Sequence, residues 1–308
     1  MLRMKGICMI IAGSILWGAT GPLLEWILDS TDISVPFLLT VRLFIAGTCL
    51  LAVLAFKGVD IFGVWKTAAW RNQLIIFGIL GMLGLQYTFV AAIEASNAVV
   101  ATLLQFSAPI FVALYVSLSQ KKLPPRYQVI GIAGTLAGLF LLLTNGSPSE
   151  LLVSKEALLW GLAVGITYSF YTLYPARLMQ EWSVLLIVGW SMLIGGIFLG
   201  LVSRTWQSDE WAIIADPSLL FILLVLIFFS TTAFVLFLNS MKFISAVETC
   251  ILSSVEPLTA MIVSAIWFHT MLQGIQLLGV LIMIIFVVWL SVGGQKTVAR
   301  KEAAMQNG

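Results

Sequence analysis

Long apolar segments dominate this sequence and constrain its fold more than any other feature. A helix needs about 20 apolar residues to cross the hydrocarbon core of a bilayer. Segments of that length recur along nearly the whole chain, and only 10% of the residues are charged while 60% are hydrophobic. A water-soluble surface cannot be built from that composition. The sequence therefore predicts an all-α, polytopic membrane protein with ten transmembrane helices, at 5–26, 34–56, 72–93, 96–118, 127–144, 157–178, 184–203, 217–240, 244–267 and 273–292.

Basic residues alternate between the predicted loops and so indicate an orientation. Lys and Arg accumulate on the cytoplasmic side of membrane proteins. With the N-terminus inside, thirteen of the sixteen basic residues fall in cytoplasmic loops or tails, and the outer loops hold only Lys155 and Arg204. The sequence predicts a multi-pass protein of the cell membrane whose N- and C-termini are both cytoplasmic, with residues 293–308 as a cytoplasmic tail.

Several classes of function lack the residues that they need. A net charge of +2 without a long basic block gives no indication of a nucleic-acid partner. The three cysteines form no disulfide or zinc pattern, and the single histidine, His269, cannot build a multi-histidine metal site. Neither a phosphate-binding glycine-rich loop nor a nucleophile motif is present. We therefore expect no cofactor, no bound metal, no direct use of ATP and no enzymatic activity.

The second half of the sequence is similar to the first. Residues 96–115 align with residues 244–263 at one constant offset, which pairs Pro109 with Pro257. Nearly the same offset pairs Ala46-Gly47 with Gly195-Gly196, and Trp17-Gly18 with Tyr168-Ser169. Five spans in each half is an odd number, so the second half must enter from the opposite side of the membrane. We therefore predict two inverted five-helix repeats, at 1–148 and 149–292, which is an arrangement typical of secondary transporters.

On these residues the chain resembles a known family. Two five-helix halves, Trp17-Gly18, Pro36 with Arg42, and the prolines of the fourth and ninth spans are similar to EamA-type members of the drug/metabolite transporter superfamily. In that family the fourth and ninth spans often end in Gly-Glu, and this chain has Ser119-Gln120 and Phe268-His269 there. The resemblance implies a ten-helix metabolite transporter that works by alternating access around a central cavity.

Two charged residues are expected deep in the bilayer, where charges usually face a cavity or a partner. Arg42 would lie about 12 Å from the outer surface at 1.5 Å per residue, and Glu256 near mid-depth. Arg42 could bind a substrate carboxylate, and Glu256 could exchange a proton. The alternatives are a structural ion pair between them, or an Arg42 side chain that extends outward toward Glu25.

Other candidates are polar, aromatic or proline residues near the centres of the spans. Pro109 and Pro257 occupy matching positions and could bend helices that act as gates, or they could be simple packing kinks. Polar and aromatic side chains recur at Gln86, Ser107, Tyr171, Ser191 and Ser253 as well as at the candidates below. Each one could equally make a helix–helix contact, so they indicate a cavity only as a set. The predicted substrate-binding residues are Trp17, Arg42, Tyr87, Gln105, Tyr168, Trp190, Asn239 and Glu256.

These features predict a secondary active transporter that exports small organic metabolites such as amino acids, with protons as possible coupling ions. The direction and the amino-acid class come from the family resemblance alone. An intramembrane lipid-modifying enzyme is the main alternative, although the clustered acids, histidines or nucleophile–base pair that it needs are missing. A membrane sensor that binds a solute without moving it is the other alternative, and inverted halves argue against it.

Overall fold

The computed structural model describes residues 2–121, 125–147, 152–240, 243–244, 252–253, 255–269 and 272–289. Within these ranges every regular element is a helix. Eight helical stretches are long and apolar enough to cross a membrane: Arg3–Ser30, Val35–Phe56, Ala68–Ala95, Ala98–Ser119, Arg126–Thr144, Lys155–Glu181, Val184–Ser203 and Pro217–Phe237. Two shorter apolar helices, Val255–Phe268 and Gly274–Trp289, lie where the ninth and tenth spans are predicted. The chain is a multi-pass, all-helical membrane protein.

Several of these stretches contain more than one element. The helices are α1 (Leu2–Ser30), α2 (Val35–Phe56), η1 (Gly63–Trp65), α3 (Ala68–Ile76), the π-helix η2 (Phe77–Leu83), α4 (Gly84–Ala95), α5 (Ala98–Gln105), α6 (Ala108–Gln120), α7 (Arg126–Thr144), α8 (Lys155–Leu173), α9 (Ala176–Glu181), α10 (Val184–Ser203), η3 (Thr205–Gln207), η4 (Asp209–Ala212), α11 (Pro217–Ser240) and α13 (Val255–Phe268). Local sequence explains where many of them begin. Ser34, Asn97 and Ser154 each precede a helix and accept a hydrogen bond from the backbone N–H three residues later.

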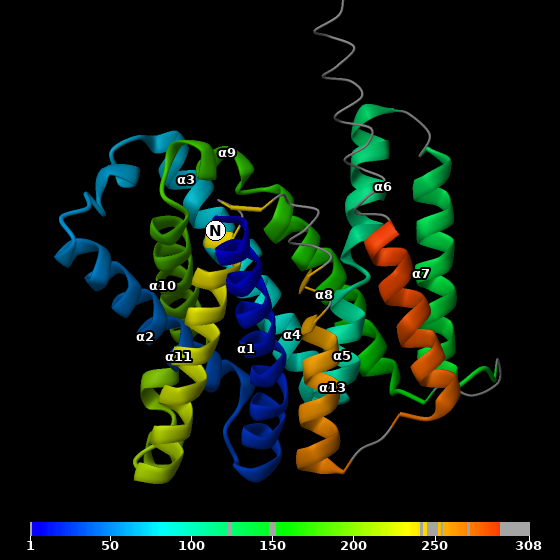
Figure 1. Cartoon of the computed structure of the whole chain (residues 1–308). Coiled ribbons are helices and arrows are strands. Elements are labelled where there is room, and N and C mark those ends of the chain that lie inside the picture. Colours follow the sequence, from blue (N-terminus) through cyan, green and yellow to red (C-terminus); the bar gives the residue numbers. More distant parts are fainter. Residues whose placement is uncertain are drawn as a thin grey trace, which may run out of the picture.

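Successive long helices run in alternating directions through the bundle (Figure 1). The N-terminus, the loop between α2 and α3, and α9 lie at one end, which we call the N-terminal face. The loop between α1 and α2 and the segment between α10 and α11 lie at the opposite face. Lys57, Lys66 and Arg177 belong to the N-terminal face, whereas Arg204 belongs to the opposite one. The alternation of basic residues thus follows the geometry, and the assignment of the N-terminal face to the cytoplasm stays a prediction.

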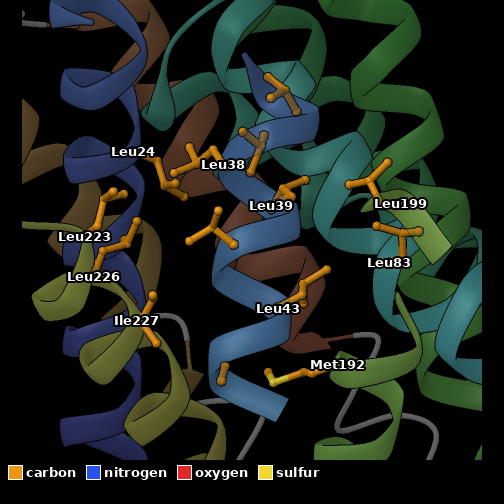
Figure 2. Packing of buried hydrophobic residues seen from close by; sticks show 14 of the residues in the cluster. Leu24, Leu38, Leu39, Leu43, Leu83, Met192, Leu199, Leu223, Leu226 and Ile227 are labelled. Carbon is orange, nitrogen blue, oxygen red and sulfur yellow. The ribbon is translucent and has the colours of Figure 1, made fainter. Parts of the chain in front are cut away.

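Helices α2 and α10 pack closely against each other. A Cβ atom added to Gly47 on α2 would lie 2.5 Å from the backbone nitrogen of Leu193 on α10, so only glycine permits this approach. Around this pair lies a cluster of buried side chains that includes Leu38, Leu39, Leu43 and Met192 (Figure 2). The clustered side chains also come from α1, α4 and α11, so α2 is covered on several sides by the rest of the bundle.

The pairs of helices in contact have a regular pattern. Helix α1 contacts α11 and α13, while α8 contacts α4 and both parts of the interrupted span α5–α6. Helix α2 contacts α10. Helix α7 crosses the helix Gly274–Trp289, where a Cβ atom on Gly138 would lie 2.6 Å from the carbonyl oxygen of Gly279. If each helix is replaced by its counterpart in the other predicted repeat, these same pairs of helices are again in contact.

Candidate functional site

A small cavity lies among helices from both halves of the chain. It encloses about 20 Å³, which is room for one or two water molecules. Helices α1, α2, α4, α5, α11 and α13 supply its walls. The lining residues are Trp17, Thr20, Leu24, Arg42, Leu85, Gln86, Phe89, Gln105, Phe234 and Glu256. A solute larger than water needs the helices to move before it can enter a cavity of this size.

Arg42 carries the positive charge of the cavity. Its side chain is only 6% exposed, in the second turn of α2. Among the described residues it has neither a hydrogen-bond partner nor an ion-pair partner. The predicted extension toward Glu25 is not observed, because the Glu25 carboxylate accepts a hydrogen bond from the backbone N–H of Ala98 at 2.7 Å. A buried guanidinium without a partner costs several kcal/mol. A role for Arg42 in binding an anion stays a prediction.

Glu256 supplies an acidic side chain to the same cavity. It is 5% exposed in the first turn of α13, and its Oε1 accepts a hydrogen bond from Nε2 of Gln105 on α5 at 3.4 Å. That bond joins residues that are 151 positions apart, one in each half of the sequence. Within the described part of the chain, Glu256 and Arg42 share the cavity without a direct ion pair.

Close packing of α1 against α13 fixes the position of Glu256. A Cβ atom on Gly18 would lie 2.4 Å from the carbonyl oxygen of Glu256 and 2.8 Å from Cβ of Thr259. The matching contact in the other half joins α8 to the start of α6, where the Ser169 hydroxyl donates to the carbonyl oxygen of Ala108 at 2.9 Å. The sequence alignment pairs Gly18 with Ser169, so the two contacts correspond.

Aromatic rings from four helical elements pack against one another beside the cavity. The rings of Trp17 and Phe234 lie 4.5 Å apart between centroids. Phe234 contacts Tyr171 at 6.3 Å, and Tyr171 stacks on Phe77 at 5.5 Å. Such pairs add to the free energy that burial of the rings already provides. These contacts therefore join α1, α11, α8 and η2 beside the cavity.

Four of the predicted substrate-binding residues thus line one cavity: Trp17, Arg42, Gln105 and Glu256. The other four lie outside its lining. Tyr87 packs against Trp160. Tyr168 lies beside Tyr171. The indole N–H of Trp190 donates to the carbonyl oxygen of Ile61 at 2.7 Å in the loop at the N-terminal face, and Nδ2 of Asn239 donates to Val235 one turn earlier in α11.

Pro109 follows an interruption of its span instead of bending a continuous helix. Helix α5 ends at Gln105 and α6 starts at Ala108, so Pro109 lies in the first turn of α6. Proline has no N–H to offer the carbonyl of Gln105, which explains why the helix breaks four residues before it. Pro257 lies in the first turn of α13, and residues 251 and 254 lie outside the described ranges. A gating role for either proline stays a prediction.

Sequence reasoning missed most of the apolar lining. Leu24, Leu85, Phe89 and Phe234 line the cavity, yet an apolar residue in an apolar span carries no signal that distinguishes a cavity wall from ordinary packing. Gln86 belongs to the polar residues at the centres of the spans but is not among the predicted substrate-binding residues. Its amide in an otherwise apolar stretch was the available signal.

The comparisons with known proteins agree with this architecture. The model of the EamA-like transporter family matches residues 4–144 and again residues 155–292. The chain belongs to the EamA-like transporter family. It is 33% identical over 292 residues to the uncharacterized inner membrane transporter YicL of Salmonella typhimurium, covering 95% of this chain and 97% of the relative. It is 25% identical over 299 residues to the uncharacterized transporter YwfM of Bacillus subtilis, covering 96% and 97%.

A solved crystal structure has the same fold. It covers 96% of this chain and 99% of its own, with a TM-score of 0.63 at 16% sequence identity. The family and its relatives are transporters, which confirms the predicted membership in the EamA family and indicates that this EamA chain is a membrane transporter and not an enzyme.

Proposed function

We propose that this EamA protein is a secondary active transporter that exports small organic metabolites such as amino acids. Two inverted five-helix repeats would open a shared central cavity to one side of the membrane and then to the other. The repeats correspond to 1–148 and 149–292, and both termini are cytoplasmic. Protons are the proposed coupling ions, with the Glu256 carboxyl as the group that carries them.

The pattern of helix contacts supports the inverted repeat. The family model matches two separate segments of similar length. The contacts of α1 with α11 and α13 reappear as contacts of α8 with α4 and with α5–α6. Two halves that are related in this way can exchange conformations, so that an opening on one side becomes an opening on the other.

The observation that carries the proposal is the buried Arg42 side chain, which has no hydrogen-bond or ion-pair partner among the described residues and shares the cavity with Glu256. A structural role would pair the two charges, because an uncompensated buried charge is destabilising. A solute that bears a carboxylate or another anionic group satisfies Arg42 when it binds. The aromatic and aliphatic walls suit a small apolar side chain on the same solute.

Glu256 can recognise a cationic group or exchange a proton with the passing solute. A carboxyl group that binds a proton on one side and releases it on the other couples transport to the proton gradient. Within the described ranges, the side-chain carboxylate accepts one hydrogen bond, the long one from Gln105 at 3.4 Å. Such a weakly held carboxylate is free to change its partner during transport.

Purified protein in proteoliposomes tests the proposal. Labelled amino acids, hydroxy acids, simple carboxylates and sugars are screened for uptake and efflux, with and without a pH gradient. We expect flux of an anionic or zwitterionic solute, loss of that flux in Arg42→Met, and a changed pH profile in Glu256→Gln. The matched controls, Arg126→Met and Glu94→Gln, change exposed residues outside the cavity and should transport normally.

Two outcomes would contradict the proposal. The first is the absence of flux for every class of solute, in protein whose cooperative thermal transition shows that it is folded. The second is normal flux in Arg42→Met, because the observation that carries the proposal would then have no role in transport. Flux with an unchanged rate and pH profile in Glu256→Gln would remove the proton role alone.

A further inference from the structure

Gln86 has an amide group in the cavity wall that the protein itself leaves incompletely bonded. The side chain is 6% exposed, and its Oε1 is buried without a hydrogen-bond partner among the described residues. Its Nε2 donates to the sulfur of Met82 at 3.2 Å, and a thioether is a weak acceptor. A buried acceptor without a donor is destabilising, so its presence needs an explanation.

The backbone around Gln86 explains why its amide faces the cavity. The π-helix η2 ends at Leu83, three residues before Gln86, and π-helical turns inside spans are frequent at functional sites. Leu85, Gln86 and Phe89 all line the cavity. Thr88 faces the other way and hydrogen-bonds Thr167 on α8 at 2.9 Å. The π-helical turn therefore sets the rotation of α4 that directs Gln86 inward.

We propose that Gln86 binds the substrate, and that its side-chain oxygen accepts a hydrogen bond from an N–H or O–H group of the transported solute. The proposal rests on the proposed function, because it requires a solute in this cavity. Arg42 lines the same cavity and would hold the anionic group of that solute. The substrate then carries a donor close to its anionic group, as amino acids and hydroxy acids do and plain carboxylates do not.

The first test measures the stability of the empty protein. Gln86→Leu keeps a side chain of similar size and removes the unpaired oxygen. We expect the thermal transition in detergent to rise by a few degrees, because the side-chain oxygen has no partner to lose and the bond to the Met82 sulfur is weak. The matched control is Gln276→Leu, outside the cavity, whose Nε2 donates to the carbonyl oxygen of Leu142 at 3.2 Å. This control should lower the transition, because it leaves that carbonyl without its donor.

The second test measures binding by equilibrium dialysis of three probes with one carbon skeleton: leucine, 2-hydroxy-4-methylpentanoate and 4-methylpentanoate. Wild-type protein should bind a probe with a donor group about five- to tenfold more tightly than the plain carboxylate, the value of one hydrogen bond. Gln86→Leu should reduce that ratio to about one, through weaker binding of the donor-bearing probe. Gln276→Leu should keep the wild-type ratio.

Each remaining outcome overturns the proposal. The first is an affinity ratio between the probes that is unchanged in Gln86→Leu. The second is a wild-type protein that binds all the probes equally or binds none of them. The third is a thermal transition that falls in Gln86→Leu as it does in Gln276→Leu. The result is separable from the proposed function. If Gln86→Leu loses the discrimination between probes but the wild-type protein shows no flux in proteoliposomes, transport is rejected and the binding role of Gln86 is retained. If the protein transports and Gln86→Leu still discriminates between the probes, only the role of Gln86 is rejected.

Discussion

Replacing Gly18 with alanine should disturb the site through a single methyl group. The added Cβ would lie 2.4 Å from the carbonyl oxygen of Glu256 on α13. Ordinary contact requires about 1 Å more separation, and the atom in the way is backbone, which cannot rotate aside. Overpacking of this kind costs about 1–3 kcal/mol. Alanine in place of glycine inside a helix returns about 0.5–1 kcal/mol. We therefore expect Gly18→Ala to lower the free energy of unfolding by about 1–2 kcal/mol.

The assay for Gly18→Ala is thermal unfolding in detergent, with transport in proteoliposomes beside it. The transition should fall by a few degrees. Transport should fall by about tenfold or more, because Glu256 moves relative to Gln105 and Arg42. The control is Gly21→Ala one turn further along α1, where the added Cβ would lie 3.3 Å from Cβ of Ala98 and should cost little. A Gly18→Ala protein as stable and as active as Gly21→Ala would refute the packing of α1 on α13 described above.

Three further predictions concern stability. Arg42→Met should abolish transport but raise the thermal transition of the empty protein, because it removes a buried charge that has no partner among the described residues. A lower transition would indicate that Arg42 is structurally paired. Gly138→Ala should lower the free energy of unfolding by about 1–2 kcal/mol after the same helical gain of alanine is subtracted, because its Cβ would meet the carbonyl oxygen of Gly279 at 2.6 Å. Unchanged unfolding would reject that crossing. Glu210→Ala should cost about 1–2 kcal/mol in chemical unfolding, because the carboxylate accepts hydrogen bonds from both N and Oγ of Ser34 at the start of α2.

The spans could be predicted from the sequence because the bilayer imposes one strong requirement, namely length in apolar residues. The breaks inside them were less predictable. The interruption after Gln105 follows from Pro109. The π-helix at Phe77–Leu83 has no comparable marker, because it contains only Phe, Gly, Ile, Leu and Met. A local change of helical winding of this kind depends on how neighbouring helices pack, and a single sequence does not report that packing.

The charged and polar part of the site could be found from the sequence because such residues are costly in a membrane and therefore rare. The sequence predicts Arg42, Gln105 and Glu256 as site residues for this reason, and the structure brings them into one cavity with Trp17. It predicts Tyr87 for the same reason, but Tyr87 lies on another side of α4, against Trp160. Adjacent residues on a helix differ by about 100° in direction, and hydropathy does not fix the rotation of a span that is apolar on every side.

The rotation of each span is the information that the sequence lacked. On α10, Trp190 directs its indole N–H to the loop at the N-terminal face. On α11, Asn239 bonds within its own helix. Both are polar or amphipathic residues in apolar surroundings, as the cavity residues are. Only the packed structure distinguishes a side chain that supports the bundle from one that faces the cavity.

The central claim is that one cavity opens to each side of the membrane in turn, and thiol accessibility at Thr20 tests it most directly. Thr20 lines the cavity and is 2% exposed in this conformation. Thr20→Cys is made in protein whose native cysteines are replaced, reconstituted in one orientation, and exposed to a membrane-impermeant thiol reagent from the inside or from the outside. Thr135→Cys, a buried position on α7 outside the cavity, is the matched control. We predict that Thr20→Cys is labelled from either side and that a transported solute slows the labelling. The control should not be labelled. Labelling of Thr20→Cys from one side only, in protein that transports, would contradict alternating access.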